Sequence, residues 1–174
     1  MEIRGLRETD QAAYLAYRQD FLTHDVTNPY GAGVRRQLRE DDTVSAAIAR
    51  AMANLNPDAE WRVPQLEYYL FTDAGVIAGK TNCRLKMTPE LAVTGGHIGY
   101  VVAPSQRGHG YAQQLLRFAL AFFRQRHEPS VLVSAYTNNA ASRHIIEANG
   151  GVLQQVVPGE AGMAETLCIY KISL

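Results

Sequence analysis

Apolar and polar residues along this chain recur with both helical and strand periods. The clearest helix begins at Tyr111, from which Leu115, Phe118, Ala119 and Phe122 follow at helical spacing. This spacing predicts one apolar face that lies on a sheet, with the aromatic residues packed in the core.

Shorter patterns and turn signals place the other elements. Thr9 or Asp10 can cap a helix that runs towards Asp25, and Asn28-Pro29-Tyr30-Gly31-Ala32-Gly33 ends it. A second helix is predicted over Arg35–Leu55. Its cluster Arg39-Glu40-Asp41-Asp42 is interpreted as a solvated face, and the alternative is an acidic patch that attracts an amine substrate. Strands are predicted over Glu2–Leu6, Leu66–Thr72, Val76–Met87, His97–Ala103, Val131–Tyr136, Val152–Val157 and Thr166–Ile172, a further helix over Asn139–Asn149, and loops over Met87–Gly96 and Pro158–Ala164.

The order β-α-α-β-β-β-α-β-α-β-β predicts one α/β domain over residues 1–174, with helices on both faces of a mixed sheet. The 17 basic and 17 acidic residues balance, so charge indicates neither nucleic acid nor membrane as a partner. The N-terminus lacks the apolar core of a signal peptide, which favours a cytoplasmic protein. We therefore expect the two cysteines, Cys83 and Cys168, to be buried free thiols.

One segment, Val101–Ala112, indicates a strand that turns through a glycine-bearing loop into a helix. The first amides of a helix have no internal partners and carry the positive end of its dipole, so such units bind anions. Gly108 and Gly110 let the backbone approach phosphate oxygens closely, and Arg107 adds a cation. The loop is therefore predicted to bind a pyrophosphate.

The spacing within the loop narrows the type of site. It lacks the Lys-Ser/Thr of a P-loop, and Gln113 stands where a dinucleotide-binding fingerprint needs a small residue. What remains is Arg-x-x-Gly-x-Ala, from Arg107 through Gly110 to Ala112. This resembles the pyrophosphate-loop signature of the Gcn5-related N-acetyltransferase (GNAT) superfamily. The alternative is a glycine-rich connecting turn without a ligand.

A second segment strengthens the resemblance. Asn139 to Gly151 is similar to the family's later motif, Asn-x-x-Ser followed by a helix that ends in Glu-x-x-Gly. By itself the segment indicates only a helix capped by Asn138 or Asn139 and ended by Gly150. His97-Ile98-Gly99-Tyr100 and Asn149-Gly150-Gly151 further resemble a bacterial branch of these enzymes. The likeness covers Gln65–Val157 and is weak over the first sixty residues.

The resemblance implies a mixed, mostly antiparallel sheet and acetyl-CoA as co-substrate, without a metal. It also implies an amine acceptor bound by His24–Pro64 and Met87–Gly96, and it allows a homodimer. The backbone near Tyr100 to Val102 should pair with the pantetheine arm, and one of its amides should polarise the acetyl carbonyl. The residues implied to bind the coenzyme are Tyr100, Val101, Val102, Arg107, Gly108, His109, Gly110, Tyr111, Ala112, Asn139 and Ser142.

Acetyl transfer also needs a base that accepts the proton of the amine, and a proton or a polar environment for the departing thiolate. His97 is the candidate base, because it lies ten residues before Arg107, where histone acetyltransferases of this superfamily place a glutamate. The alternative is a hydrogen-bonded histidine that shapes the start of the strand. Glu67 and Tyr100 are further catalytic candidates that could act through water. The alternative for Glu67 is a surface residue of a strand, and the alternative for Tyr100 is a core residue.

The acid is left unassigned, because Ile146 occupies the position of the family's usual tyrosine. Tyr136 could substitute for that tyrosine, but a packed aromatic residue is the favoured interpretation. The leading hypothesis is an acetyl-CoA-dependent N-acetyltransferase acting on a small molecule or a peptide. The alternative is a catalytically inactive acyl-CoA sensor or scaffold of the same fold, and a third reading is an enzyme with a longer acyl donor or a hydroxyl acceptor.

Overall fold

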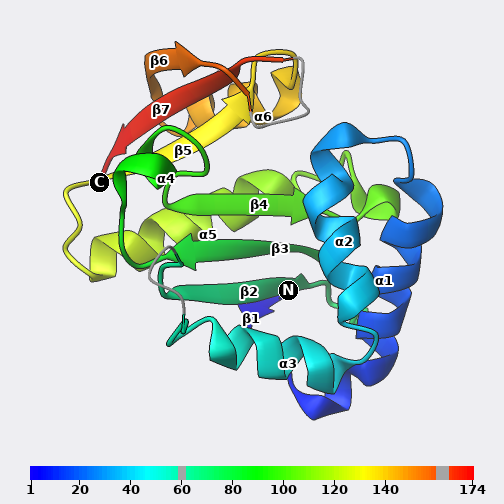
Figure 1. The fold of residues 1–174 in the computed structure, drawn as a ribbon. Helices are drawn as coiled ribbons and strands as arrows, with labels where there is room; N and C mark the ends of the chain where they lie inside the picture. Colours follow the sequence, from blue (N-terminus) through cyan, green and yellow to red (C-terminus); the bar gives the residue numbers. More distant parts are fainter. Residues whose placement is uncertain (59–61, 160–164) are drawn as a thin grey trace.

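The computed structural model describes residues 1–58, 62–159 and 165–174. Its seven strands form one sheet in the order β1-β2-β3-β4-β5-β7-β6, antiparallel except for the β4–β5 pair (Figure 1). The mixed α/β architecture predicted from the sequence is therefore confirmed. The strands are β1 (Glu2–Arg4), β2 (Gln65–Phe71), β3 (Ile77–Arg84), β4 (Ile98–Val102), β5 (Ser130–Tyr136), β6 (Val152–Val157) and β7 (Leu167–Ser173).

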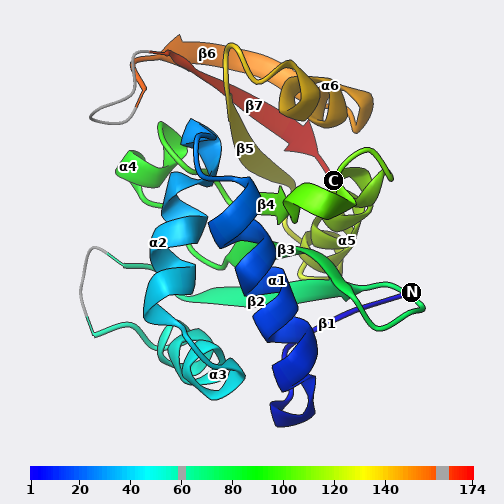
Figure 2. The same ribbon diagram turned by 90° about the vertical axis from the view of Figure 1, so that its right-hand side faces the viewer.

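Helices cover both faces of this sheet (Figures 1 and 2). On one face lie α1 (Gln11–His24), α2 (Ala32–Glu40) and α3 (Val44–Ala53), which enclose a cluster that includes Tyr14, Tyr17 and Phe21. On the other face lie α5 (Tyr111–Gln125) and α6 (Ala140–Ala148). The remaining helical segments are α4 (Pro89–Ala92) and the 3-10 turns η1 (Glu8–Asp10), η2 (Pro29–Gly31) and η3 (Pro104–Gln106).

The parallel strands β4 and β5 are paired only where β4 begins, beside the middle of β5. Ile98 lies opposite Val133, after which β5 continues beside β7 while β4 stays beside β3 (Figure 1). The amide of Ala103 bonds Ala78 and the carbonyl of His97 accepts from Arg84, so odd-numbered residues of β4 bond β3. The backbone groups of the alternate residues Tyr100 and Val102 therefore point to the side from which β5 has diverged.

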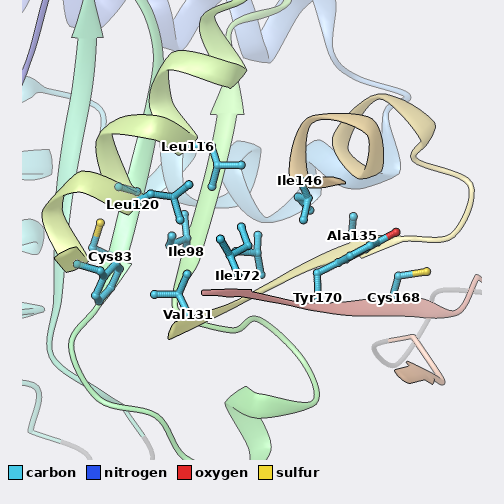
Figure 3. Close-up of a cluster of buried hydrophobic side chains, with 13 residues drawn as sticks. Cys83, Ile98, Leu116, Leu120, Val131, Ala135, Ile146, Cys168, Tyr170 and Ile172 are labelled. Atoms are coloured by element: carbon cyan, nitrogen blue, oxygen red, sulfur yellow. The ribbon is translucent and has the colours of Figure 1, made fainter. Parts of the chain in front are cut away.

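The core between α5, α6 and the sheet is fully apolar at its centre (Figure 3). Leu115 and Ala119 are buried as predicted. Leu116, Leu120 and Phe123 are buried as well, so the apolar face of α5 is wider than the face predicted from the sequence. Of the predicted aromatic core residues, Phe118 and Phe122 are only half-buried and lie at the margin of the cluster, against the ring of Tyr68.

Both cysteines are buried and free, as predicted. Burial raises the pKa of the Cys83 thiol to about 12, so this thiol stays protonated and unreactive. Within the described residues, no helix is long and apolar enough to cross a membrane. The closing strands β6 and β7 pair antiparallel as predicted, and most of the loop between them, residues 160–164, lies outside the described residues.

The predicted helix Arg35–Leu55 is wrong as a single element. It is two helices, α2 and α3, separated by Asp41, Asp42 and Thr43. The side chain of Thr43 accepts a hydrogen bond from the amide of Ala46 and begins α3 as an N-cap. Of the predicted solvated face, Arg39, Glu40 and Asp42 are exposed, but Asp41 is buried. The predicted loop Met87–Gly96 contains the short helix α4.

Candidate active site

A cavity of about 530 Å³ lies where β4 and β5 diverge. The turn after α1, strand β4, the loop before α5 and the start of α6 contribute its walls. Of the residues that the sequence implied for coenzyme binding, all but His109 line it. The predicted residues that line the cavity are Tyr100, Val101, Val102, Arg107, Gly108, Gly110, Tyr111, Ala112, Asn139 and Ser142.

The loop before α5 has the geometry of an anion site. Gly108 and Gly110 have φ values of +83° and +75°, which favour glycine. Gly110 is the N-cap of α5, and no side chain caps the first amides of this helix. These amides and the positive end of the helix dipole therefore face the cavity. His109 is exposed instead, and its ring stacks on Tyr111 with the centroids 5.7 Å apart.

The start of α6 brings two further predicted residues together. The side chain of Asn139 accepts a hydrogen bond from the amide of Ser142 at 3.2 Å, as predicted for a cap. The hydroxyl of Tyr100 lies 2.8 Å from the hydroxyl oxygen of Ser142. Burial raises the pKa of Tyr100, so its hydroxyl keeps its proton at neutral pH.

The family profile described as "Acetyltransferase (GNAT) domain" matches residues 1–152. The chain belongs to the GNAT acetyltransferase family. Its match over the first sixty residues extends the resemblance beyond Gln65–Val157. No functionally curated protein matches the sequence.

Solved GNAT structures share the fold at low sequence identity. An N-acetyltransferase from Staphylococcus aureus Mu50 is 18% identical with a TM-score of 0.66, covering 99% of this chain and 97% of its own. A spermidine N-acetyltransferase chimera that includes Vibrio cholerae sequence is 13% identical with a TM-score of 0.65, covering 99% and 96%. The ribosomal-protein alpha-N-acetyltransferase RimL, in complex with coenzyme A, is 16% identical with a TM-score of 0.66, covering 99% and 93%. The chain is thus an acetyltransferase of this family, and its substrates must be argued from its own residues.

Ile146, where many GNAT proteins carry a tyrosine, is completely buried in the core beneath α6 (Figure 3). Tyr136 stacks on Tyr30 of η2 with the ring centroids 5.4 Å apart, and the Tyr30 hydroxyl donates to the side chain of Asn138. The packed-aromatic interpretation of Tyr136 therefore fits its surroundings.

His97 immediately precedes β4 and is not among the residues that line the cavity. Its Nδ1 accepts a hydrogen bond from the amide of Leu132 at 2.9 Å, and its ring packs edge-on against Phe123. Burial lowers the pKa of His97, so the ring is neutral and carries its proton on Nε2. In this tautomer neither nitrogen offers a lone pair to an amine, which favours the alternative of a histidine that shapes the strand.

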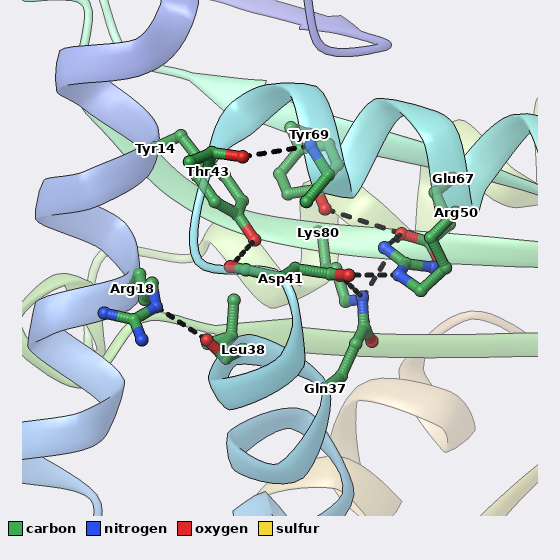
Figure 4. A network of polar contacts seen from close by, with 11 residues as sticks. Tyr14, Arg18, Gln37, Leu38, Asp41, Thr43, Arg50, Glu67, Tyr69 and Lys80 are labelled. Atoms are coloured by element: carbon green, nitrogen blue, oxygen red, sulfur yellow. Dashed lines mark hydrogen bonds and ion pairs between the residues drawn. The ribbon is translucent and has the colours of Figure 1, made fainter.

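Glu67 is neither in this cavity nor on the surface. Its side chain is 4% exposed, and its two oxygens accept hydrogen bonds from the guanidinium of Arg50 at 2.6 and 2.9 Å (Figure 4). The ammonium of Lys80 lies 3.4 Å away, and Arg50 also bonds Asp41. Burial would raise the pKa of Glu67, but Lys80 and Arg50 outweigh it and lower the pKa from 4.5 to about 2. A carboxylate held in this way is a weak base.

A second, more polar cavity of about 620 Å³ lies over this ion-pair network. Arg50 and Glu67 contribute to it, together with residues of α2, α3, α4 and the ends of β2 and β3. Most of these segments belong to His24–Pro64 and Met87–Gly96, the ranges implied for the acceptor. The structure thus brings the two ranges together around one cavity.

Eight residues that line the first cavity were not among those implied for coenzyme binding. Five of them come from one stretch of the chain: Phe21, Asp25, Asn28, Tyr30 and Gly31. They lie at the end of α1 and in the turn that follows it. The turn signal Asn28-Pro29-Tyr30-Gly31 was visible in the sequence, but it indicated only where a helix ends. Nothing in the spacing connects this turn to a loop some eighty residues later.

Proposed function

We propose that this acetyltransferase moves an acetyl group from acetyl-CoA directly to a primary amine of a small molecule or peptide. One observation carries the proposal: a single cavity joins the uncapped start of α5 to the open edge of β4. The first feature fits the pyrophosphate of the coenzyme, and the second fits its amide-bearing pantetheine arm. The family membership and the RimL complex with coenzyme A support this choice of donor.

The open edge of β4 supplies the groups that acyl transfer needs. Backbone groups of Tyr100 and Val102 on this edge can pair with the pantetheine amides like one more strand. An amide at the same edge can donate to the acetyl carbonyl and stabilise the oxyanion that forms when the amine attacks. The new C–N bond forms, the amine loses a proton to solvent, and the C–S bond breaks to release the coenzyme thiolate.

We assign protonation of that thiolate to the Tyr100–Ser142 hydroxyl pair. Both side chains line the cavity, and the Tyr100 hydroxyl is protonated at neutral pH for the reason given above. We expect Tyr100→Phe to lower kcat by roughly 100-fold or more, as loss of a general acid does. The Kd of acetyl-CoA should change by less than about threefold, because the backbone of β4 is unaltered.

Steady-state kinetics and calorimetry on Tyr100→Phe separate these effects, with Tyr136→Phe as the matched control. Tyr136 is not among the residues that line the cavity, and its ring packs on Tyr30, which does line it. An unchanged kcat in Tyr100→Phe, or an equal loss in both variants, would contradict the assignment.

A non-catalytic acyl-CoA sensor is the second candidate, and Ile146 in place of the usual tyrosine favours it. The two functions are separated by following thiol release from acetyl-CoA with a panel of polyamines, amino acids, peptides and amino alcohols. Turnover that needs an amine supports the proposal. Tight coenzyme binding without turnover across the panel supports the sensor, and turnover only with hydroxyl acceptors or longer acyl donors would correct the substrate class.

A further inference from the structure

A buried carboxylate lies directly behind the arginine of the pyrophosphate loop. Asp25 follows α1, and its side chain is 1% exposed. Its Oδ1 accepts a hydrogen bond from Nη2 of Arg107 at 2.6 Å, whereas the Arg107 side chain remains 45% exposed. One edge of the guanidinium is therefore held from behind, and the rest of this cavity-lining side chain stays accessible.

The turn after α1 is built around this carboxylate. Asn28 donates from its side-chain amide to both oxygens of Asp25, at 3.1 and 3.2 Å. Arg35 donates from Nη1 to the backbone carbonyls of Asp25 and Asn28, at 2.6 and 2.7 Å. A Cβ at Gly31 would come within 2.1 Å of Asp25 Oδ2, so only glycine leaves room for the carboxylate there. These contacts fix the position of the Asp25 side chain.

The charges at this end of the cavity do not cancel. Asp25 contributes one negative charge, and the two neighbouring guanidinium groups of Arg35 and Arg107 contribute two positive charges. The cluster therefore keeps a net positive charge and attracts an anion. Because the guanidinium is already held, less side-chain entropy is lost when an anion binds to it.

We propose that Asp25 is a positioning residue for the coenzyme. It holds Arg107 so that the exposed N–H groups of the guanidinium face the pyrophosphate. This inference rests on the proposed function. Positioning and simple electrostatics predict opposite results, since removal of a nearby negative charge would by itself tighten the binding of an anion.

The test is a double-mutant cycle in which calorimetry gives the Kd of acetyl-CoA for wild type, Asp25→Asn, Arg107→Ala and the double variant. We expect Asp25→Asn to weaken binding about tenfold in the wild-type background and to have no further effect beside Arg107→Ala. A purely structural role would weaken both backgrounds alike. That result, or unchanged or tighter binding in Asp25→Asn, would overturn the inference.

A second carboxylate, which lies within α1, provides the matched control. Asp20 accepts hydrogen bonds from the amide and hydroxyl of Ser105 at 3.0 and 2.9 Å, so it also contacts this loop, but at Ser105 rather than at Arg107. Any effect of Asp20→Asn should therefore be equal in the two backgrounds. Coupling of Asp20→Asn to Arg107 as strong as that of Asp25→Asn would contradict a specific role for Asp25.

The Cβ that Gly31→Ala adds clashes with the Asp25 carboxylate and with Nη1 of Arg35 and changes no charge. If Asp25→Asn fails to fold, the same double-mutant cycle is run with Gly31→Ala. This substitution should also weaken binding about tenfold, and only when Arg107 is present. Wild-type protein that does not bind acetyl-CoA would defeat the proposed function and this inference together. Wild-type binding that Asp25→Asn and Gly31→Ala leave intact would defeat the inference alone.

Discussion

Glu67→Gln is expected to lower the free energy of unfolding by about 3 kcal/mol at neutral pH. The pKa of Glu67 is lowered from 4.5 to about 2, and each unit of pKa shift corresponds to about 1.4 kcal/mol. Removal of the carboxylate also leaves the buried Lys80 beside Arg50 without its main counter-charge (Figure 4). Urea denaturation measures this difference.

The pH dependence of this effect has a definite sign. The folded-state pKa of Glu67 lies below its ordinary value, so its contribution is complete above about pH 4.5 and disappears as the pH falls towards 2. The stability difference between wild type and Glu67→Gln should therefore shrink over that interval. The control is Glu40→Gln at an exposed position of the same polar cavity, with an expected change of less than about 0.5 kcal/mol. Equal effects in the two variants would refute the role assigned to the buried network.

Gly110→Asp is expected to weaken acetyl-CoA binding roughly 100-fold or more. The substitution places a carboxylate at the N-cap of α5, where the proposal places the pyrophosphate, and juxtaposed like charges cost several kcal/mol. A Cβ at Gly110 meets no atom within 4 Å, so the space itself is open. Calorimetric titration gives the Kd.

Gly110→Asn is the matched control for this prediction. Asparagine and aspartate both tolerate the positive φ of +75° better than other residues with a side chain, so the backbone cost is shared. Aspartate is at least as good an N-cap as asparagine, so the melting temperature of Gly110→Asp should not be lower than that of Gly110→Asn. Weaker binding in the aspartate variant alone then reports charge. Equal affinities of the two variants for acetyl-CoA would show that the pyrophosphate does not bind at this loop.

The sequence predicted the parts of the structure that local signals determine. Gly108, Gly110 and Arg107 lie together at the start of α5, and Asn139 caps α6 as expected. Each of these features depends on residues within a few positions of one another. The residues proposed to bind the coenzyme could therefore be chosen from two short motifs, and nearly all of them line one cavity.

The remaining features depend on contacts between distant segments. The break between α2 and α3 follows from the burial of Asp41, whose carboxylate bonds Arg50 and whose carbonyl accepts from Tyr14. Glu67 looked like a surface strand residue because its charged partners lie in α3 and β3. Hydrophobic periodicity carries no information about which charges meet in the fold.

Calorimetric titration of the wild-type protein with acetyl-CoA shows whether the cavity beside β4 binds the coenzyme. We expect one site per chain with a Kd in the micromolar range. Absence of binding at millimolar acetyl-CoA would contradict this expectation, and the roles proposed for Tyr100, Arg107 and Gly110 would then have to be withdrawn.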